Sequence, residues 1–179
     1  MSERGQKLPE RMDDTRFEEL YAAYATDVLR MCCFYLKDRQ KAEDVTQDVF
    51  VKLITSNPVL EPGKEKAWLL RVALNRCRDL WRSAWLKRVV LGSAAMERKS
   101  APEMLNAAVE RREMLEAIGK LKPDYREVIL LHYYQGQEIR DIAQILGAPE
   151  GTVASRLSRG RKLLGAILKE TWESSDTEE

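Results

Sequence analysis

The chain has 179 residues, of which 44% are hydrophobic, and its formal net charge is +1. This length and composition allow one or two small hydrophobic cores. No apolar run is long enough to cross a membrane and no signal peptide is recognisable, so we expect a cytoplasmic protein without direct membrane insertion. Three cysteines (Cys32, Cys33 and Cys77) form no C-x-x-C pair and the single histidine, His132, is distant in sequence. This pattern argues against a disulfide framework, a metal site or another cofactor.

The near-neutral total hides an uneven distribution of charge. Residues 1–60 carry nine basic and eleven acidic side chains, whereas residues 64–88 carry eight basic and two acidic ones. A strongly basic block therefore lies in the middle of the chain.

Two helices are expected in the N-terminal third. Apolar residues recur at spacings of three and four from about residue 13 to Leu36, which predicts an amphipathic helix. Asp38 can cap a second helix that runs to about Ile54 and buries Ala42, Val45, Val49 and Leu53. The other side of this second helix presents four residues at i, i+3, i+4 and i+7, which form one stripe: Asp44, Gln47, Asp48 and Val51. Such an acidic stripe is usually only a solvated face.

A third, longer helix is expected from about residue 65 to residue 86, after a break at residues 56–63 that contains two prolines and a glycine. Its buried side should consist of Leu69, Val72, Ala73, Leu80 and Ala84. Its other side carries a basic stripe of Arg71, Asn75, Arg78 and Arg82, with Trp81 and Trp85 beside it. Cations next to aromatic rings suit single-stranded nucleic acid, because the cations hold the backbone while the rings stack on bases. The tryptophans could equally be core residues, as we expect for Trp68, and Arg76 falls near the apolar side without an assigned role.

The rest of the chain predicts a linker and a second helical domain. Residues 87–102 lose periodicity and end in a proline, as expected of a flexible linker. Helical periodicity then resumes, and Pro123 opens a further helix that continues towards Gly136. The sequence therefore predicts an all-α fold with two small domains, residues 13–86 and 103–170.

Residues 137–164 contain two short helices joined by a tight turn. Gly147 follows the apolar face of the first helix and suits a left-handed C-terminal turn, and Pro149 fits the first turn of the second helix. The second helix places Val153, Leu157, Gly160 and Leu164 on one side and Ser155, Ser158, Arg159 and Lys162 on the other. A Gly-containing turn followed by a helix with a small, polar, basic outer face is the helix-turn-helix pattern, whose second helix enters a DNA major groove.

Three segments resemble sigma factors, the promoter-reading subunits of bacterial RNA polymerase. L-G-x-x-x-G-T-V-x-S-R-L followed by R-x-R is similar to their last helix-turn-helix, and K-A-E-D-V-T-Q-D-V-F-V-K-L to the segment that docks on the clamp helices of the β′ subunit. A-W-L-L-R-V-A-L-N-R-C-R-D-L-W-R resembles the helix that reads the minus-10 promoter element in the extracytoplasmic function group. The short linker is typical of that group, since primary sigma factors have a further domain there.

The resemblance implies three binding surfaces. Docking on β′ is carried over to Asp44, Gln47, Asp48 and Val51. Capture of the minus-10 strand is carried over to Lys64, Lys66, Arg71, Asn75, Arg78 and Arg82, and a flipped base of that strand would enter a pocket formed partly by about residues 56–66. Reading of the minus-35 duplex is carried over to Thr152, Ala154, Ser155, Arg156, Ser158, Arg159, Arg161 and Lys162. Among these, Ser155, Ser158 and Arg159 are the expected base readers, while the other basic residues hold phosphates.

The resemblance also implies a contact with the polymerase β flap and control by an anti-sigma factor. Two departures from the family pattern stand out: Glu138 occupies a position where Ser or Thr would cap better, and Ala154 replaces a basic residue. A helix-turn-helix regulator with an N-terminal sensing or dimerisation domain remains an alternative, although a sensor needs neither the acidic nor the basic stripe. An enzyme is the weakest option, because no histidine-based dyad, phosphate loop or ligand cluster is present.

Overall fold

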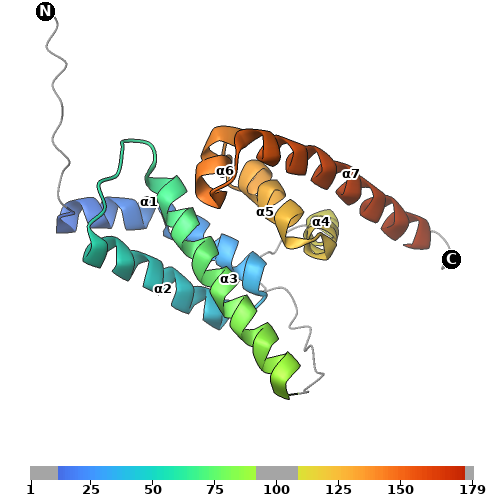
Figure 1. Cartoon of the computed structure of the whole chain (residues 1–179), viewed down its shortest axis with the longest axis horizontal. Helices are drawn as coiled ribbons and strands as arrows, with labels where there is room; N and C mark the ends of the chain where they lie inside the picture. Colours follow the sequence, from blue (N-terminus) through green and yellow to red (C-terminus); the bar gives the residue numbers. More distant parts are fainter. Residues whose placement is uncertain (1–11, 92–108, 176–179) are drawn as a thin grey trace, which may run out of the picture. The chain divides into compact units, whose positions relative to one another are not determined.

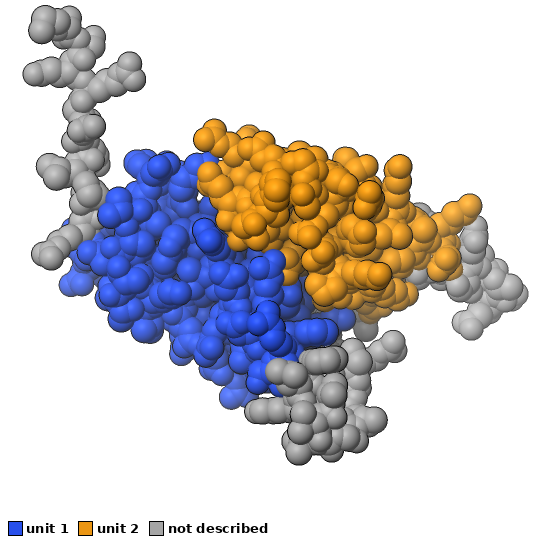
Figure 2. Space-filling model, viewed as in Figure 1, with its two compact units in different colours: residues 1–102 blue, residues 103–179 orange. Residues whose placement is uncertain are grey.

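The computed structural model describes residues 12–91 and 109–175 (Figure 1). The described residues form helices and connecting turns without a strand, which confirms the all-α prediction. They divide into two compact units, residues 1–102 and 103–179 (Figure 2). No helix in the described ranges is both long and apolar enough to span a membrane. Most of the expected linker, the segment 103–108 and the side chain of Trp85 lie outside the description.

The first unit is a bundle of three helices. They are α1 (Asp14–Leu36), α2 (Arg39–Ser56) and α3 (Glu65–Leu91), and each packs against the other two. The expected cap of α2 is present, because the Asp38 carboxylate accepts the Lys41 backbone N–H at 3.2 Å, and the Asp13 carboxylate caps α1 by accepting that of Arg16 at 2.7 Å. Each cap satisfies a backbone donor that the helix itself leaves unpaired.

The core of the first unit confirms the prediction for α2 and corrects it for α3. The four apolar residues expected on the inner side of α2 are all buried. On α3, Leu69 and Ala73 are buried as expected, but Val72, Leu80 and Ala84 are only half-buried. Their places in the core are taken by Ala67, Leu70, Leu74 and Cys77. Among the described side chains, the inner face of α3 therefore ends at Cys77, since residues 78–84 are half-buried or exposed.

All three cysteines are buried within helices. Burial raises the pKa of the Cys33 thiol, and the neighbouring Cys32 raises it further. Because the thiolate is the reactive form, a raised pKa makes Cys33 a poor nucleophile at neutral pH. Cys33 thus serves as a small apolar residue of the core.

Helix α3 is longer than its apolar pattern indicates. It continues to Leu91, so residues 87–91 extend the helix where the sequence predicts the start of the linker. A helix can continue without an apolar pattern, and three of these five residues, Lys87, Arg88 and Leu91, are good helix formers. The loss of periodicity therefore does not mark the end of the helix.

The second unit consists of α4 (Val109–Lys120), α5 (Pro123–Ile129), a single π-helical turn η1 (Leu130–Tyr134), α6 (Ile139–Leu146) and α7 (Glu150–Ser175). Helix α7 packs against α4, α5 and α6. Pro123 occupies the first turn of α5, as predicted. The π turn closes with the Gln135 backbone N–H donating to the carbonyl of Leu130 at 3.1 Å. His132 is half-buried, with its Nδ1 3.0 Å from the carbonyl oxygen of Gln137, so it belongs to the packing of this turn.

Candidate functional site

The polar stripe of α2 lies on the open side of the first unit. Asp44, Gln47 and Asp48 are exposed, and 57% of Val51 is accessible, while the opposite side of the helix is buried. The four residues therefore share one surface, as their spacing predicts. Ile54, 52% exposed, continues this surface by one further turn.

Asp48 has a partner that the sequence does not reveal. Its carboxylate accepts a hydrogen bond from Arg76 Nε of α3 at 3.2 Å, and the two side chains are 55% and 51% exposed, respectively. This ion pair gives Arg76 the role that the helical projection leaves open. Among the described residues, Asp44 and Gln47 form no such pair.

The residues of the basic stripe of α3 also share one surface. Arg71, Asn75 and Arg82 are exposed and Arg78 is half-buried, with its guanidinium 3.5 Å from the Asn75 side-chain oxygen. Trp81, 51% exposed, lies one position before Arg82, whereas Trp68 is half-buried towards the core. This side of α3 therefore offers cations, an amide and one aromatic ring to solvent.

Lys64 and Lys66 lie at the start of α3, and Lys66 faces away from this stripe. Lys64 and Lys66 are half-buried. Lys66 Nζ forms an ion pair with Asp27 of α1 at 2.8 Å. Lys66 is five positions before Arg71 and nine before Asn75, so at 3.6 residues per turn it lies on a different side of the helix. The structure thus directs Lys66 towards α1.

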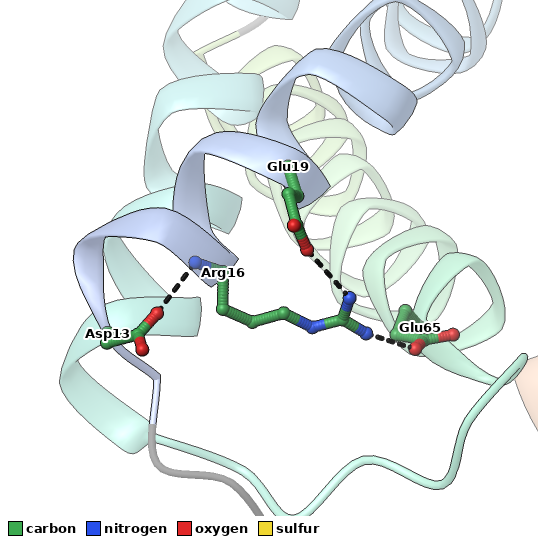
Figure 3. A network of polar contacts seen from close by, with 4 residues as sticks. All are labelled: Asp13, Arg16, Glu19 and Glu65. Carbon is green, nitrogen blue, oxygen red and sulfur yellow. Dashed lines mark hydrogen bonds and ion pairs between the residues drawn. The ribbon is translucent and has the colours of Figure 1, made fainter.

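The loop between α2 and α3, residues 57–64, is tied at one end to Met12, just before α1, and at the other end to α1 itself. The Asn57 side-chain oxygen accepts the Met12 backbone N–H at 2.9 Å. At the other end, Arg16 of α1 reaches Glu65, the first residue of α3, at 2.5 Å, and also contacts Glu19 at 3.1 Å (Figure 3). Glu65 is only 6% exposed. Val59, in the middle of the loop, is 74% exposed, so the loop is held at its ends and open at its centre.

The helix-turn-helix of the second unit is built by backbone geometry and apolar packing. Gly147 adopts the predicted left-handed conformation, with φ 64°, and its N–H donates to the carbonyl of Ala143. Helix α7 begins one residue later than expected, at Glu150, and the Pro149 carbonyl accepts the N–H groups of Thr152 and Val153. Glu138 is a poor cap for α6, as predicted, because its side chain makes no capping hydrogen bond.

Helix α7 separates its two faces as predicted. Val153, Leu157 and Gly160 are buried and Leu164 is half-buried. A position for Cβ on Gly160 would lie 3.2 Å from Ile129 Cγ1, so α5 and α7 approach closely there. The exposed residues of the outer face are Ala154, Ser155, Arg159, Arg161 and Lys162, and the half-buried ones are Thr152, Arg156 and Ser158.

The basic residues of this outer face differ in their surroundings. Arg156 forms an ion pair with Asp124 of α5 at 3.0 Å, and Arg161 Nη1 lies 3.4 Å from the Tyr133 hydroxyl. Arg159 and Lys162 form no ion pair with any residue in the described part of the chain. Both partner residues, Asp124 and Tyr133, escape sequence reasoning because they come from another part of the unit. An open hollow between α5 and α7 is lined by Lys122, Asp124, Thr152, Ser155, Arg156 and Arg159.

Comparison with known proteins accounts for both units. The model of sigma-70 region 2 matches residues 20–87 and the model of sigma-70 region 4 matches residues 111–164. The ECF RNA polymerase sigma factor SigL of Mycobacterium tuberculosis is 33% identical over 155 residues, which are 84% of this chain and 88% of SigL. The chain belongs to the extracytoplasmic function (ECF) group of the sigma-70 family. The family membership sets aside the alternative of a sensing regulator and identifies a transcription initiation factor.

Two solved structures have a similar fold, and one of them is a sigma factor. RpoE of Bartonella quintana, solved with the anti-sigma factor NepR, is 27% identical with a TM-score of 0.73, over 86% of this chain and 96% of that one. CnrH, solved with the cytosolic domain of CnrY, is 26% identical with a TM-score of 0.66, over 88% of this chain and 90% of that one. Both RpoE and CnrH are therefore seen in complex with a second protein.

Proposed function

We propose that this ECF sigma factor binds core RNA polymerase and directs it to promoters through three surfaces. Residues 13–86 dock on the β′ clamp helices and capture the minus-10 strand, and residues 103–170 read the minus-35 duplex. The polymerase supplies the active site, and this chain supplies the choice of promoter. The observation that carries the proposal is the exposed basic stripe of α3 in a chain that also presents the helix-turn-helix face of α7.

The α3 stripe suits a melted strand. Arg71 and Arg82 are exposed and form no ion pair with the described residues, so their charges are available for phosphates. Trp81 offers a stacking surface close to Arg82. A basic track with an adjacent ring is the usual arrangement for binding single-stranded nucleic acid. The loop at residues 57–64 would receive the flipped base, since its centre is exposed.

The α7 face suits duplex DNA. Arg159 is exposed, without an internal ion pair, and can make a bidentate contact with guanine in the major groove. Lys162 follows one turn later and fits a phosphate contact. Arg156, held by Asp124, and Thr152 and Ser155 line the hollow next to it. Arg161 and the small residues Ala154 and Ser158 complete the proposed minus-35 set.

The α2 surface suits a basic protein partner. Two exposed carboxylates and an amide lie in one stripe that ends in the exposed Val51. Opposite charges at the rim of an interface steer association and fix orientation. We therefore assign Asp44, Gln47, Asp48 and Val51 to the β′ clamp helices, and we assign the flap contact to the second unit as a whole.

We further propose that an anti-sigma factor holds this chain inactive. The support comes from RpoE and CnrH, which were solved with NepR and with the cytosolic domain of CnrY. A partner that covers the α2 or α3 surface would compete directly with polymerase or DNA.

Transcription with purified core polymerase tests the proposal. The chain should support unprimed, promoter-specific initiation, and sequencing of DNA retrieved with the holoenzyme should reveal paired minus-10 and minus-35 elements. Replacing Asp44, Gln47 and Asp48 by alanine should weaken core binding at least about tenfold, because truncating important interface residues costs more than ~1 kcal/mol each. Asp14→Ala with Glu18→Ala, which removes two exposed carboxylates from α1, is the matched control. A chain that binds duplex DNA alone but never associates with core polymerase would contradict the proposal.

A further inference from the structure

Two ion pairs fix the first turn of α3 against α1, and their geometry is specific. Arg16 holds Glu65 and Asp27 holds Lys66, so adjacent residues of α3 are bound by residues eleven positions apart on α1. Eleven residues of helix correspond to about 16 Å. The two side chains of α1 therefore hold the start of α3 from two separated points along α1. This arrangement resists sliding of α3 along α1 in either direction.

The Arg16–Glu65 pair is the shorter of the two and includes the most buried of the four side chains. Glu65 is 6% exposed, and its carboxylate lies 2.5 Å from the Arg16 guanidinium. Arg16 itself starts from a capped turn, since its backbone N–H is bound by Asp13, and Glu19 orients the same guanidinium (Figure 3). A buried carboxylate that loses its cation must move towards solvent or bind a proton. Loss of Arg16 would therefore displace the first turn of α3.

That first turn is also the exit of the loop at residues 57–64. The loop enters through Asn57, which is bound by the Met12 backbone, and leaves through Lys64, whose N–H donates to the Glu61 carbonyl at 3.0 Å. Between these points Val59 is open to solvent. The position of the loop is thus set by contacts with the start of α1, while its centre remains accessible to a ligand.

We propose that Arg16 is a positioning residue for base selection in the minus-10 element. Through Glu65 it fixes the exit of the loop that receives the flipped base, without touching the DNA itself. This inference rests on the proposed function of the loop. Selection of a flipped base depends on hydrogen bonds to its edge, and a displacement of about 1 Å is enough to lose such contacts. Lys66 has the same task through Asp27, which moves it from the DNA-contacting set to the positioning set.

The test measures selectivity and not only activity. Holoenzymes reconstituted from core polymerase and the full chain are compared on promoters with one minus-35 element and every single-base change in the minus-10 element. Arg16→Ala should reduce the preference at one or two minus-10 positions by about tenfold, the size of one lost base contact. Preferences within the minus-35 element should be unchanged. Arg39→Ala, which removes the Arg39–Glu43 pair within α2 at 2.8 Å, is the matched control and should keep wild-type ratios.

A rescue separates positioning from general stabilisation. The double variant Arg16→Glu with Glu65→Arg restores the pair with reversed charges and should recover the minus-10 preference. If Arg16→Ala lowers transcription from every promoter by the same factor, Arg16 is only a stabilising residue and the inference is wrong. Should Arg16→Ala fail to fold, Arg16→Gln keeps the stem and a donor, and the same ratio decides. A wild-type holoenzyme that initiates nowhere would overturn the proposed function, whereas selective initiation by both wild type and Arg16→Ala would overturn this inference alone.

Discussion

Helices α3 and α7 both present a basic stripe on a surface proposed to bind DNA, yet their first turns are held differently. The start of α3 is fixed by ion pairs that α1 provides, Arg16 with Glu65 and Asp27 with Lys66. The start of α7 is fixed by the left-handed Gly147, by the Pro149 carbonyl and by the buried Val153. Charge contacts between helices thus position one stripe, and backbone conformation positions the other.

The difference fits the two proposed ligands. Duplex DNA offers a groove of nearly constant width, so a rigid turn of fixed backbone geometry can place α7 in it. A melted strand has no fixed shape, and the loop before α3 must select a base that leaves the stack. Side-chain contacts at the ends of that loop leave its centre open while limiting its movement.

The largest effect should follow from changing the turn before α7. Gly147→Val places a β-branched residue at φ 64°, with no atom within 4 Å of the new Cβ, so the cost is backbone strain alone, roughly 3 kcal/mol. Amide hydrogen exchange in α6 and α7 should report the loss of stability, while α3 remains unaffected. Gly151→Ala is the control, because its surroundings are equally open and its helical conformation favours alanine. Equal exchange in the two variants would contradict a turn held by conformation.

The second effect concerns base reading by α7. Arg159→Ala should flatten the preference at one or two adjacent base pairs of the minus-35 element, a loss of about 2 kcal/mol of discrimination. Lys162→Ala should weaken all sequences alike and make the salt dependence shallower by about one unit of slope. Binding to a library of minus-35 variants at several salt concentrations measures both. A uniform loss with Arg159→Ala would make this arginine a phosphate contact.

The third effect concerns strand capture by α3. Asn75→Ala with Arg78→Ala should lower promoter opening about tenfold while duplex binding changes little, because the pair faces the melted strand and not the minus-35 groove. Permanganate reactivity of promoter thymines reports opening, and a filter assay for closed complexes serves as the control. A normal open complex at low holoenzyme concentration would remove these residues from the minus-10 surface.

The smallest effect should come from the second ion pair of α3. Asp27→Asn removes the charge that holds Lys66, and since both side chains are partly exposed the loss should be below about 1 kcal/mol. Faster amide exchange in the first turn of α3 should disclose it, and high salt should reduce the difference from wild type. Because salt screens charges but not backbone strain, the Gly147→Val effect should be insensitive to salt. A salt-independent Asp27→Asn effect would contradict the conclusion that charge contacts fix the start of α3 while backbone conformation fixes the start of α7.

The parts of the structure that depend on local sequence were predictable. Asp13 and Asp38 cap the helices that they precede, Pro123 opens α5 and Gly147 takes the left-handed turn, because each of these effects depends on a few neighbouring residues. The stripes of α2, α3 and α7 also follow from helical spacing. The C-terminal end of α3 was not predictable, since the helix continues for five residues beyond residue 86, the end that periodicity indicates.

The contacts that distinguish the surfaces were beyond the reach of the sequence. Arg16 and Glu65 are 49 positions apart, Asp48 and Arg76 are 28 apart, and Asp124 and Arg156 belong to different helices. Such pairs depend on the angle and offset at which helices cross, which periodicity does not fix. The sequence therefore predicts which residues share a face, while the packing of the helices decides which of them are engaged.

The Asp48–Arg76 pair has a consequence for the rate of exchange on the polymerase. With α2 docked as proposed, Asp48 meets its partner while the Arg76 guanidinium is bound to one of its two carboxylate oxygens, so Arg76 competes with the partner for this carboxylate. An exposed pair of this kind is worth about 0–1 kcal/mol, so it lowers core affinity at most about fivefold. The same neighbour competes for the carboxylate during dissociation and shortens the lifetime of the complex. An intramolecular competitor of this strength favours rapid exchange of this chain on the polymerase.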